Sequence, residues 1–379
     1  MTKNITWVGI DDSKKELAVA VVRGGKSQEV EESKVPNEDR ALKRWVRRLE
    51  RESDGGPIRM CYEAGPNGYS LKRRLESFGR VEVEVMAPSL TPRRLGHRVK
   101  TDRLDARRLV FLYRAGELSP IAVPGEDDES ARDLVRLLHG VVTETTRKRH
   151  QIQKFLVRRG RIWREGSNWT GKYRQWLGGQ TWERWADAET FLELRTGLEE
   201  LEARQRRMET ALERLAAEDQ RALAVSVLRC FHGIDTRAAL TMVTEIFDVR
   251  RFGHPRDLMG YWGMTPTVSQ TGESEHRGGI SKAGTRYGRW VLGQVAWNYR
   301  HAPRVGAGLR RRRAGQPAWA IAIADRAHQR LYRRYEALLR KGKSPHKAVT
   351  AVGRELLAFV WEALMEASTS RETSRREAA

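Results

Sequence analysis

The pattern of apolar and polar residues in the first third of the chain predicts an α/β domain. Short apolar runs between turn residues predict strands over 5–10, 16–22, 57–62 and 81–86, with a more polar strand over 28–35. A period near 3.6 residues, with Leu42, Trp45, Val46 and Leu49 on one face, predicts a helix over 37–51. Further helices are predicted up to Leu75 and through 109–114. This order of elements favours a mixed sheet with flanking helices.

The middle of the chain is charged and helical. Residues 129–161 and 188–227 each carry a leucine-rich apolar stripe, which predicts an antiparallel helical pair and a coiled-coil arm. Its predicted tip, 161–185, holds five tryptophans among arginines and lysines. Such tryptophans either stack on exposed bases of single-stranded RNA or pack a core or a subunit contact, and packing is the commoner use.

The last part of the chain is mainly helical. His232-Gly233-Ile234-Asp235 followed by an apolar helix over 238–246 is similar to the start of a helix-hairpin-helix, which suits a phosphate. A Gly-, Ser- and Thr-rich loop is predicted over 263–284, with helices over 285–299 and within 319–365. We therefore expect an α/β catalytic domain at 1–125, the arm at 126–227, a further domain at 228–315 and a basic C-terminal helical segment at 316–379.

Charge narrows the class of partner. The net charge of +22 favours a polyanion, because neutralising phosphates releases counterions; a solubilising surface is the alternative. Cys61 and Cys230 stand alone, which indicates buried thiols in a reducing compartment and argues against zinc. With no long apolar run and no signal-peptide pattern, we expect a cytoplasmic, nucleoid-associated protein without a membrane partner.

Four acidic residues stand where a metal site could form. Asp11 and Glu63 end predicted strands, and such ends meet at one edge of an α/β sheet. Asp102 and Asp105 are three apart on a predicted helix and share one face. Clustered carboxylates repel one another unless a cation lies between them, and hard oxygen ligands select Mg²⁺ or Mn²⁺. Two such ions serve phosphodiester chemistry well. Alternatively, Asp102 caps its helix and Asp105 pairs with Arg108.

These residues carry a resemblance to a known family. Gly9-Ile10-Asp11, Cys61-Tyr62-Glu63-Ala64 and the run Lys100-Thr101-Asp102-Arg103-Leu104-Asp105-Ala106-Arg107 resemble the DEDD-type transposases of insertion sequences, the IS110 family. Gly233-Ile234, Phe252, Gly263-Met264-Thr265-Pro266, Gly272 and Gly279-Ile280-Ser281-Lys282-Ala283-Gly284 resemble its C-terminal domain in the same order. The resemblance covers most of residues 5–305 and rests on the order of short motifs.

The resemblance implies a fold and a mechanism. It implies a RuvC-like, RNase H-type first domain, a helical arm and a C-terminal transposase domain. It implies that Asp11, Glu63, Asp102 and Asp105 hold Mg²⁺ and that a serine before a glycine attacks DNA and stays covalently linked to it. It further implies dimers that pair into tetramers, active sites shared between subunits, double-stranded donor and target DNA, and a structured non-coding bridge RNA as guide.

The chain departs from the family at the nucleophile. Thr271 precedes Gly272 where the family usually has serine. Threonine also carries a hydroxyl, although its methyl group crowds the attack. Ser269 and Ser274 are the alternative nucleophiles, and a turn residue in an impaired enzyme is the remaining interpretation.

Basic residues around these motifs are candidates for nucleic-acid contacts. They are Arg98, Lys100, Arg103, Arg107, Lys282, Arg310, Arg311, Arg312 and Arg313. The leading hypothesis is therefore a Mg²⁺-dependent DNA transposase that cuts and rejoins strands under RNA guidance. The alternatives are a junction-resolving nuclease that uses water as its nucleophile and a catalytically inactive nucleic-acid-binding protein.

Overall fold

The structure, a computed structural model, describes residues 4–24, 29–92, 101–271 and 274–377. The chain divides into two compact units, Met1–Pro124 and Gly125–Ala379. Within the described ranges, no helix combines the length and the apolar character that crossing a membrane requires.

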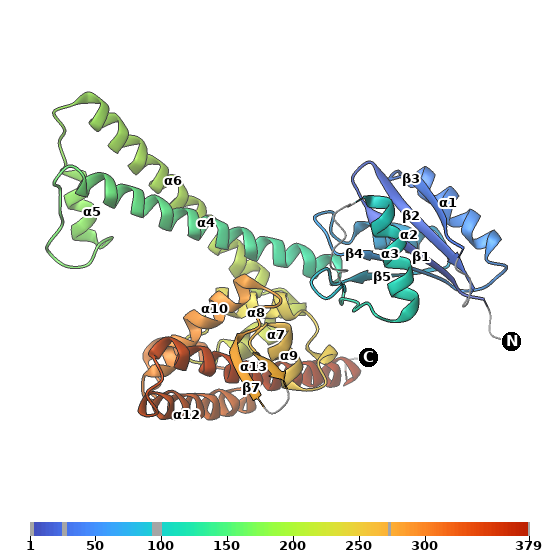
Figure 1. The fold of residues 1–379 in the computed structure, drawn as a ribbon. Coiled ribbons are helices and arrows are strands. Elements are labelled where there is room, and N and C mark those ends of the chain that lie inside the picture. Colours follow the sequence, from blue (N-terminus) through green and yellow to red (C-terminus); the bar gives the residue numbers. More distant parts are fainter. Residues whose placement is uncertain (1–3, 25–28, 93–100, 272–273, 378–379) are drawn as a thin grey trace. The chain divides into compact units, whose positions relative to one another are not determined.

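A five-stranded mixed sheet forms the centre of the first unit (Figure 1). Its strands are β1 (Thr6–Asp12), β2 (Glu16–Arg23), β3 (Glu31–Pro36), β4 (Ile58–Glu63) and β5 (Val81–Met86). The strand order is β3-β2-β1-β4-β5, in which β1–β2 and β2–β3 are antiparallel while β1–β4 and β4–β5 are parallel. The five predicted strands are confirmed, with ends that differ by a few residues.

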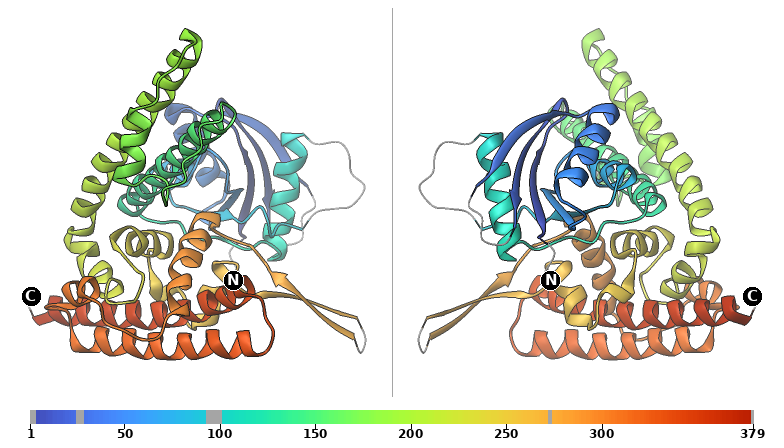
Figure 2. Two further views of the ribbon diagram at one scale, coloured as in Figure 1. Left: turned by 90° about the vertical axis from the view of Figure 1, so that its left-hand side faces the viewer. Right: turned by 90° about the vertical axis from the view of Figure 1, so that its right-hand side faces the viewer.

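Helices cover both faces of this sheet (Figure 2). On one face, α1 (Asp39–Glu52) and α2 (Ser70–Phe78) bury their leucines against Val8 and Ile10 of β1. On the other face, α3 (Asp102–Ala115) packs Ala106 and Val110 against the small residues of β2. The sheet with its flanking helices, followed by a helical C-terminal region, is consistent with the expected RuvC-like fold.

Local chemistry sets the ends of α3. The Thr101 hydroxyl accepts a hydrogen bond from the Leu104 N–H at 3.3 Å, which satisfies a free donor of the first turn. Asp102 and Asp105 stand in that turn, where the helix dipole favours negative charge. Gly116, with φ 73°, ends the helix in the left-handed conformation that glycine adopts at little cost. It is therefore Thr101, and not Asp102, that caps this helix.

The second unit begins with a helical hairpin (Figure 1). The long helices α4 (Glu126–Val157) and α6 (Trp185–Ala216) pack together, and α5 (Gly171–Gly178) lies between them in sequence, at the tip. The helical arm is therefore present, whereas its supercoiling as a coiled coil stays a prediction. The predicted helix over 188–227 is interrupted: α7 (Asp219–Leu228) is a separate element.

The tryptophans of the tip belong to a core. Trp163, Trp169, Trp176 and Trp182 pack against buried residues such as Phe155 and Phe191. Trp163 and Trp176 lie 5.6 Å apart between ring centroids. Packing, the favoured alternative, is confirmed for these four. Trp185 is the exception at 81% exposed.

Most of the remaining helices share one hydrophobic core with the N-terminal half of α4 and the C-terminal end of α6. They are α8 (Thr236–Ile246), η1 (Val249–Arg251), α9 (Pro255–Tyr261), α10 (Arg286–Ala296), η2 (Trp297–Arg300), α12 (Ala318–Arg340) and α13 (Pro345–Glu377). The short helix α11 (Ala307–Arg313) precedes α12. Trp262 and Phe231 are fully buried within it. The regions predicted at 228–315 and 316–379 thus contribute to a common core.

The expectation of a loop over 263–284 was wrong for most of its length. Strands β6 (Pro266–Thr271) and β7 (Ser274–Ile280) form an antiparallel hairpin that extends from the helices (Figure 2). At its base, Gly263 (φ 63°) and Gly284 (φ 66°) adopt left-handed conformations. A Cβ at either glycine would collide with backbone atoms of the opposite segment. The glycines that suggested a loop therefore serve the pinched base of a hairpin.

Candidate functional site

The structure places Asp11 and Glu63 side by side along the sheet. In the parallel pair β1–β4, the last paired residues are Ile10 and Tyr62, and Asp11 and Glu63 follow them directly. Residues two apart on a strand share a face, so Asp11 lies on the face of Gly9 and Glu63 on the face of Cys61. Gly9 packs against α3, and the Cys61 thiol contacts the carbonyl of Leu109 in α3 at 3.8 Å. Both carboxylates therefore belong to the face that α3 covers.

Helix α3 runs against the direction of β1 and brings Asp102 and Asp105 toward the same end. Trp7 and Tyr113 lie 5.2 Å apart between ring centroids, whereas Gly9 is covered by Ala106 and Val110. Asp11 is about 7 Å beyond Gly9 along the strand, which corresponds to between four and five residues along a helix. The first turn of α3 is therefore level with Asp11.

A row of paired residues supports this position of Asp102. Asp11 is paired with Ala18 on β2, and Ala18 with Lys34 on β3, so the three share one face. The Glu16 carboxylate, and in smaller part Asp102, raises the pKa of the Lys34 ammonium. Asp102 therefore carries its charge over the end of the sheet where Asp11 lies. We call Asp11, Glu63, Asp102 and Asp105 the carboxylate site.

The elements that carry the carboxylate site converge, but within the described part of the chain their side chains do not form a closed set of metal ligands. Among the residues that the structure describes, no three His, Cys, Asp or Glu side chains come close enough together to hold a metal ion. Asp102 is exposed, while Asp11, Glu63 and Asp105 are half-buried. Metal binding by this set accordingly remains a prediction.

Asp12 is a neighbouring carboxylate that the sequence analysis passed over. It follows Asp11, so its side chain lies on the opposite face of β1. Burial raises the pKa of Asp12, against the lowering effects of Asn67 and Arg74, and its Oδ1 is buried without a hydrogen-bond partner among the described residues. Alternation separates it from α3 and from the carboxylate site.

Arg103 and Arg107 have a protein partner that no local pattern revealed. Both pair with Glu32 of β3, Arg107 at 3.3 Å, and the Glu32 side chain is only 16% exposed. These ion pairs attach α3 to the sheet. Contact of the two arginines with nucleic acid stays a prediction, and Arg98 and Lys100 lie outside the described residues.

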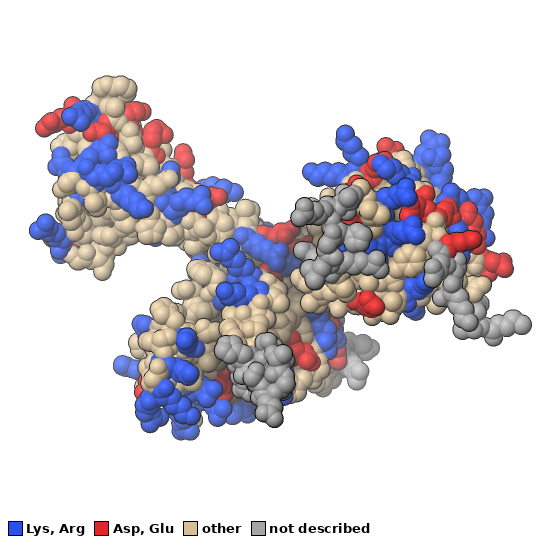
Figure 3. Space-filling view, in the orientation of Figure 1, with Lys and Arg blue, Asp and Glu red and all other residues tan. Residues whose placement is uncertain are grey.

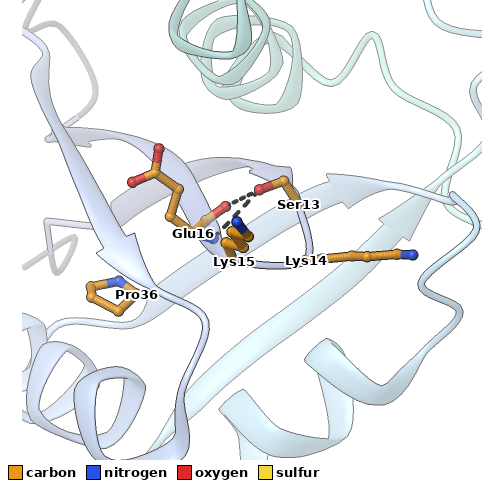
Figure 4. A pocket seen from close by; sticks show the side chains of 5 residues that line it. All are labelled: Ser13, Lys14, Lys15, Glu16 and Pro36. Carbon is orange, nitrogen blue, oxygen red and sulfur yellow. Dashed lines mark hydrogen bonds between the residues drawn. The ribbon is translucent and has the colours of Figure 1, made fainter.

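A shallow depression adjoins the same end of the sheet (Figure 4). It is lined by Ser13, Lys14, Lys15, Glu16 and Pro36, from the β1–β2 turn and the end of β3. The Ser13 hydroxyl donates to the Glu16 carbonyl and accepts from the Glu16 N–H, which closes the turn. The turn thereby presents two lysines immediately after the strand that carries Asp11.

The candidate nucleophiles lie at the far end of the β6–β7 hairpin. Thr271 and Ser274 are paired across its turn, and Ser269 is paired with His276. The side chains of these residues lie outside the described part of the chain. Lys282 is exposed with φ 59°, and its N–H donates to the Gly263 carbonyl at 3.0 Å. The hairpin therefore carries all three candidate hydroxyls on two short strands.

Two predicted phosphate contacts need correction. Arg313 is 8% exposed, pairs with Asp325 at 2.8 Å and donates to the Cys230 carbonyl. Arg312 donates to the Arg229 carbonyl, which leaves Arg310 and Arg311 as the exposed members of that run. The predicted phosphate site at the start of the helix-hairpin-helix-like segment is wrong as well, because the N-terminus of α8 already has a partner.

The N-terminus of α8 is already occupied by a carboxylate. Asp235 accepts the Ala238 N–H at 2.8 Å and so puts its own negative charge where a phosphate was expected. Gly233, with φ 77°, faces the Asn298 side chain, which occupies the space of a Cβ. This glycine serves packing against η2.

Comparison with known proteins identifies the family. Residues 8–159 match the model of the DEDD transposases of IS110 type, and residues 225–308 match the model described as "Transposase IS116/IS110/IS902 family". The chain is 38% identical over 362 residues to y4qE of Sinorhizobium fredii, a protein named as a transposase, covering 95% of this chain and 89% of that protein. It is 27% identical over 344 residues to the "Transposase for insertion sequence element IS1533" of Leptospira borgpetersenii, covering 90% and 99%. The chain therefore belongs to the IS110 family of DEDD-type insertion-sequence transposases and is a DNA transposase.

Proposed function

We propose that this transposase cuts and rejoins DNA through a divalent-metal site formed by Asp11, Glu63, Asp102 and Asp105. The observation that carries the proposal is the convergence of three elements: the ends of β1 and β4 and the first turn of α3. Family members generally use divalent metal ions. The fold supports the proposal because each carboxylate lies on a secondary-structure element and not on a long loop.

The donor set fits a hard cation. All four groups offer carboxylate oxygens, which Mg²⁺ and Mn²⁺ prefer over nitrogen or sulfur ligands. Like charges repel, so we expect these side chains to draw together only around a cation. Four carboxylates provide enough oxygens for two ions. Bound there, the ions would polarise the scissile phosphate and stabilise the leaving oxygen.

The proposed nucleophile is a hydroxyl of the hairpin, with Thr271 first and Ser269 and Ser274 as alternatives. Its oxygen attacks phosphorus, a new O–P bond forms, and the bond to the leaving DNA oxygen breaks; that oxygen takes up a proton. A free DNA hydroxyl then attacks the protein-linked phosphate, which releases the threonine and rejoins the strand. The chain's own task is to hold one hydroxyl in line with the departing oxygen.

Oligomer and guide follow from the family resemblance. We propose dimers that pair into tetramers, in which an active site combines the first unit of one subunit with the hairpin of another. We also propose a structured non-coding bridge RNA that selects donor and target DNA. A structured, transcribed non-coding stretch beside the gene that binds the purified protein would support this guide, and its absence would argue against it.

Asp11→Asn and Glu63→Gln test the metal site. Loss of one ligand should lower the cleavage rate by on the order of 10²-fold or more, since a bound ion contributes several kcal/mol. Asp12→Asn is the matched control: it removes a similar charge one residue later, on the other face of β1. Mn²⁺ binding measured by calorimetry should weaken in the first two variants only. Equal cleavage in all three variants would refute the site.

Thr271→Ala tests the nucleophile. We expect loss of the covalent protein–DNA product, which Thr271→Ser should restore. An undiminished product would move the role to Ser269 or Ser274, to be decided with their alanine variants. The threonine also favours a second candidate, a nuclease that uses water: cleavage without any covalent product would support it. Cleavage that survives Asp11→Asn together with Asp102→Asn would contradict both mechanisms.

A further inference from the structure

The positive charge of the chain is concentrated at the end of α12. Residues 326–347 contain eight Lys and Arg and a single acidic residue, Glu336. About a third of the net charge of +22 thus falls within 22 residues. Figure 3 shows Lys and Arg side chains crowded over α12. Three of the eight, Arg340 at the end of α12 and Lys341 and Lys343 just after it, are exposed.

Four arginines of this segment surround a shallow depression on the side of α12 that borders α13. Its lining is Arg326, Gln329, Arg330, Arg333, Arg334 and Ala337, which we call the α12 basic face. Successive arginines are four, three and one residue apart, so all four lie on one side of the helix. From Arg326 to Arg334 the helix rises about 12 Å. Along one strand of duplex DNA about 3.4 Å separates successive phosphates on the helix axis, so the length of this face spans three to four such spacings.

Carboxylates of α13 hold these arginines without neutralising them. Arg330 pairs with Glu355 at 2.6 Å, and Arg326 pairs with Glu362. Arg334 is 3.7 Å from the same Glu355, so three guanidinium groups share two carboxylates. The side chains of Arg326 and Arg330 remain 59% and 64% exposed. Arg333 is exposed and has no ion-pair partner among the described residues.

We propose that the α12 basic face binds the sugar-phosphate backbone of duplex DNA, the nucleic acid on which a DNA transposase acts. An arginine held on one side by a carboxylate loses less freedom when its outward N–H groups bind a phosphate, and its planar fork suits phosphate oxygens. Such contacts position a strand without reading its sequence. The face is built from side chains of α12 alone, so its role is to hold nucleic acid and not to cleave it.

The test is the salt dependence of binding. Arg333→Ala leaves the Arg326–Glu362 and Arg330–Glu355 pairs in place, so α12 and α13 stay joined. Each lost phosphate contact should reduce the slope of log K against log salt by about 0.9 for duplex DNA or about 0.7 for a single strand. Arg326→Ala with Arg333→Ala should reduce it by about 1.8 or 1.4. Titrations with duplex DNA test the proposal, and titrations with structured RNA are the comparison: a reduced slope on RNA alone would assign the face to RNA and overturn it.

Controls separate a local contact from a change of net charge. Arg206→Ala with Arg207→Ala removes the same charge from an exposed part of α6 in the arm. Arg326→Lys with Arg333→Lys keeps the charge and should retain most of the slope. The proposal predicts a reduced slope on duplex DNA only for the alanine variants of α12, with unchanged hydrogen exchange of the α12 and α13 amides. Equal slopes in the α12 and α6 double variants, or an unchanged slope on duplex DNA, would overturn it.

Discussion

Replacing Gly9 with alanine should push α3 away from β1 and so disturb the carboxylate site. A Cβ at Gly9 would lie 2.5 Å from the Val110 nitrogen and closer still to the Ala106 carbonyl. Both are backbone atoms, so no side-chain rotation relieves the collision. The tighter contact, 2.3 Å to the Ala106 carbonyl oxygen, sets the displacement: α3 must retreat by about 1.1 Å to reach the 3.4 Å of an ordinary contact. Asp102 and Asp105 would move with it.

Two effects of different size should follow. Overpacking of this kind costs about 1–3 kcal/mol of stability. A displacement near 1 Å of a catalytic group lowers the rate by about 10²-fold, so activity should suffer more than folding. Because the chain has two units, a single unfolding midpoint is a poor measure; hydrogen exchange of the α3 amides reports the local loss. DNA cleavage at saturating Mg²⁺ reports the displacement.

Gly140 offers a matched control. It lies within α4, and nothing approaches within 4 Å of the position of its Cβ. Gly140→Ala should leave cleavage unchanged and stabilise the helix by about 0.5–1 kcal/mol. The contrary outcome is that Gly9→Ala leaves the hydrogen exchange of the α3 amides as slow as before and cleaves DNA as fast as Gly140→Ala does. That result would show that the close approach of α3 to β1 does not position the carboxylates.

Three further predictions concern the second unit. Arg136→Ala should cost about 1–3 kcal/mol of local stability, measured by hydrogen exchange of the α4 and α8 amides, because it leaves the buried Glu245 without its two hydrogen bonds of 2.8 and 3.0 Å. Burial lowers the pKa of His232 from 6.5 to about 4, so the unfolded chain protonates first and stability should fall between pH 6.5 and 4. His232→Gln should flatten that fall. Gly284→Ala should abolish the covalent DNA product while DNA binding persists, because its φ of 66° and the Tyr261 carbonyl exclude a side chain.

Each of these has a contrary outcome. Adding Glu245→Gln to Arg136→Ala should recover part of the lost stability, and no recovery would place the loss elsewhere. An equally steep acid transition after His232→Gln would assign the titration to other groups. Gly315 has φ 73° but nothing within 4 Å of its Cβ position. Gly315→Ala should therefore still form the covalent product. If that product were lost in Gly315→Ala as well, the effect of Gly284→Ala could not be assigned to the base of the hairpin.

Many of the secondary-structure elements and the four carboxylates could be predicted from short stretches of sequence. The strands β1 and β4 and the helices α1 and α8 follow from apolar periods that span a few residues. The four carboxylates were found by their place at the ends of such windows, and the motifs around them indicated the family that the comparisons then showed. These features are local, because a strand end or a helix face is set by neighbouring residues.

Other features required the folded chain. Several contacts join residues that are far apart in sequence. Arg103 and Arg107 pair with Glu32, Arg313 pairs with Asp325, and Gly9 packs against α3. The β6–β7 hairpin was missed because its glycines signal a loop locally and are explained only by backbone on the opposite segment. A guanidinium group can bind either a phosphate or a protein carboxylate, and the groups that lie near it in the folded chain determine which of the two it binds. Those neighbours are chosen when the apolar faces of distant elements pack together, and no local period records that choice.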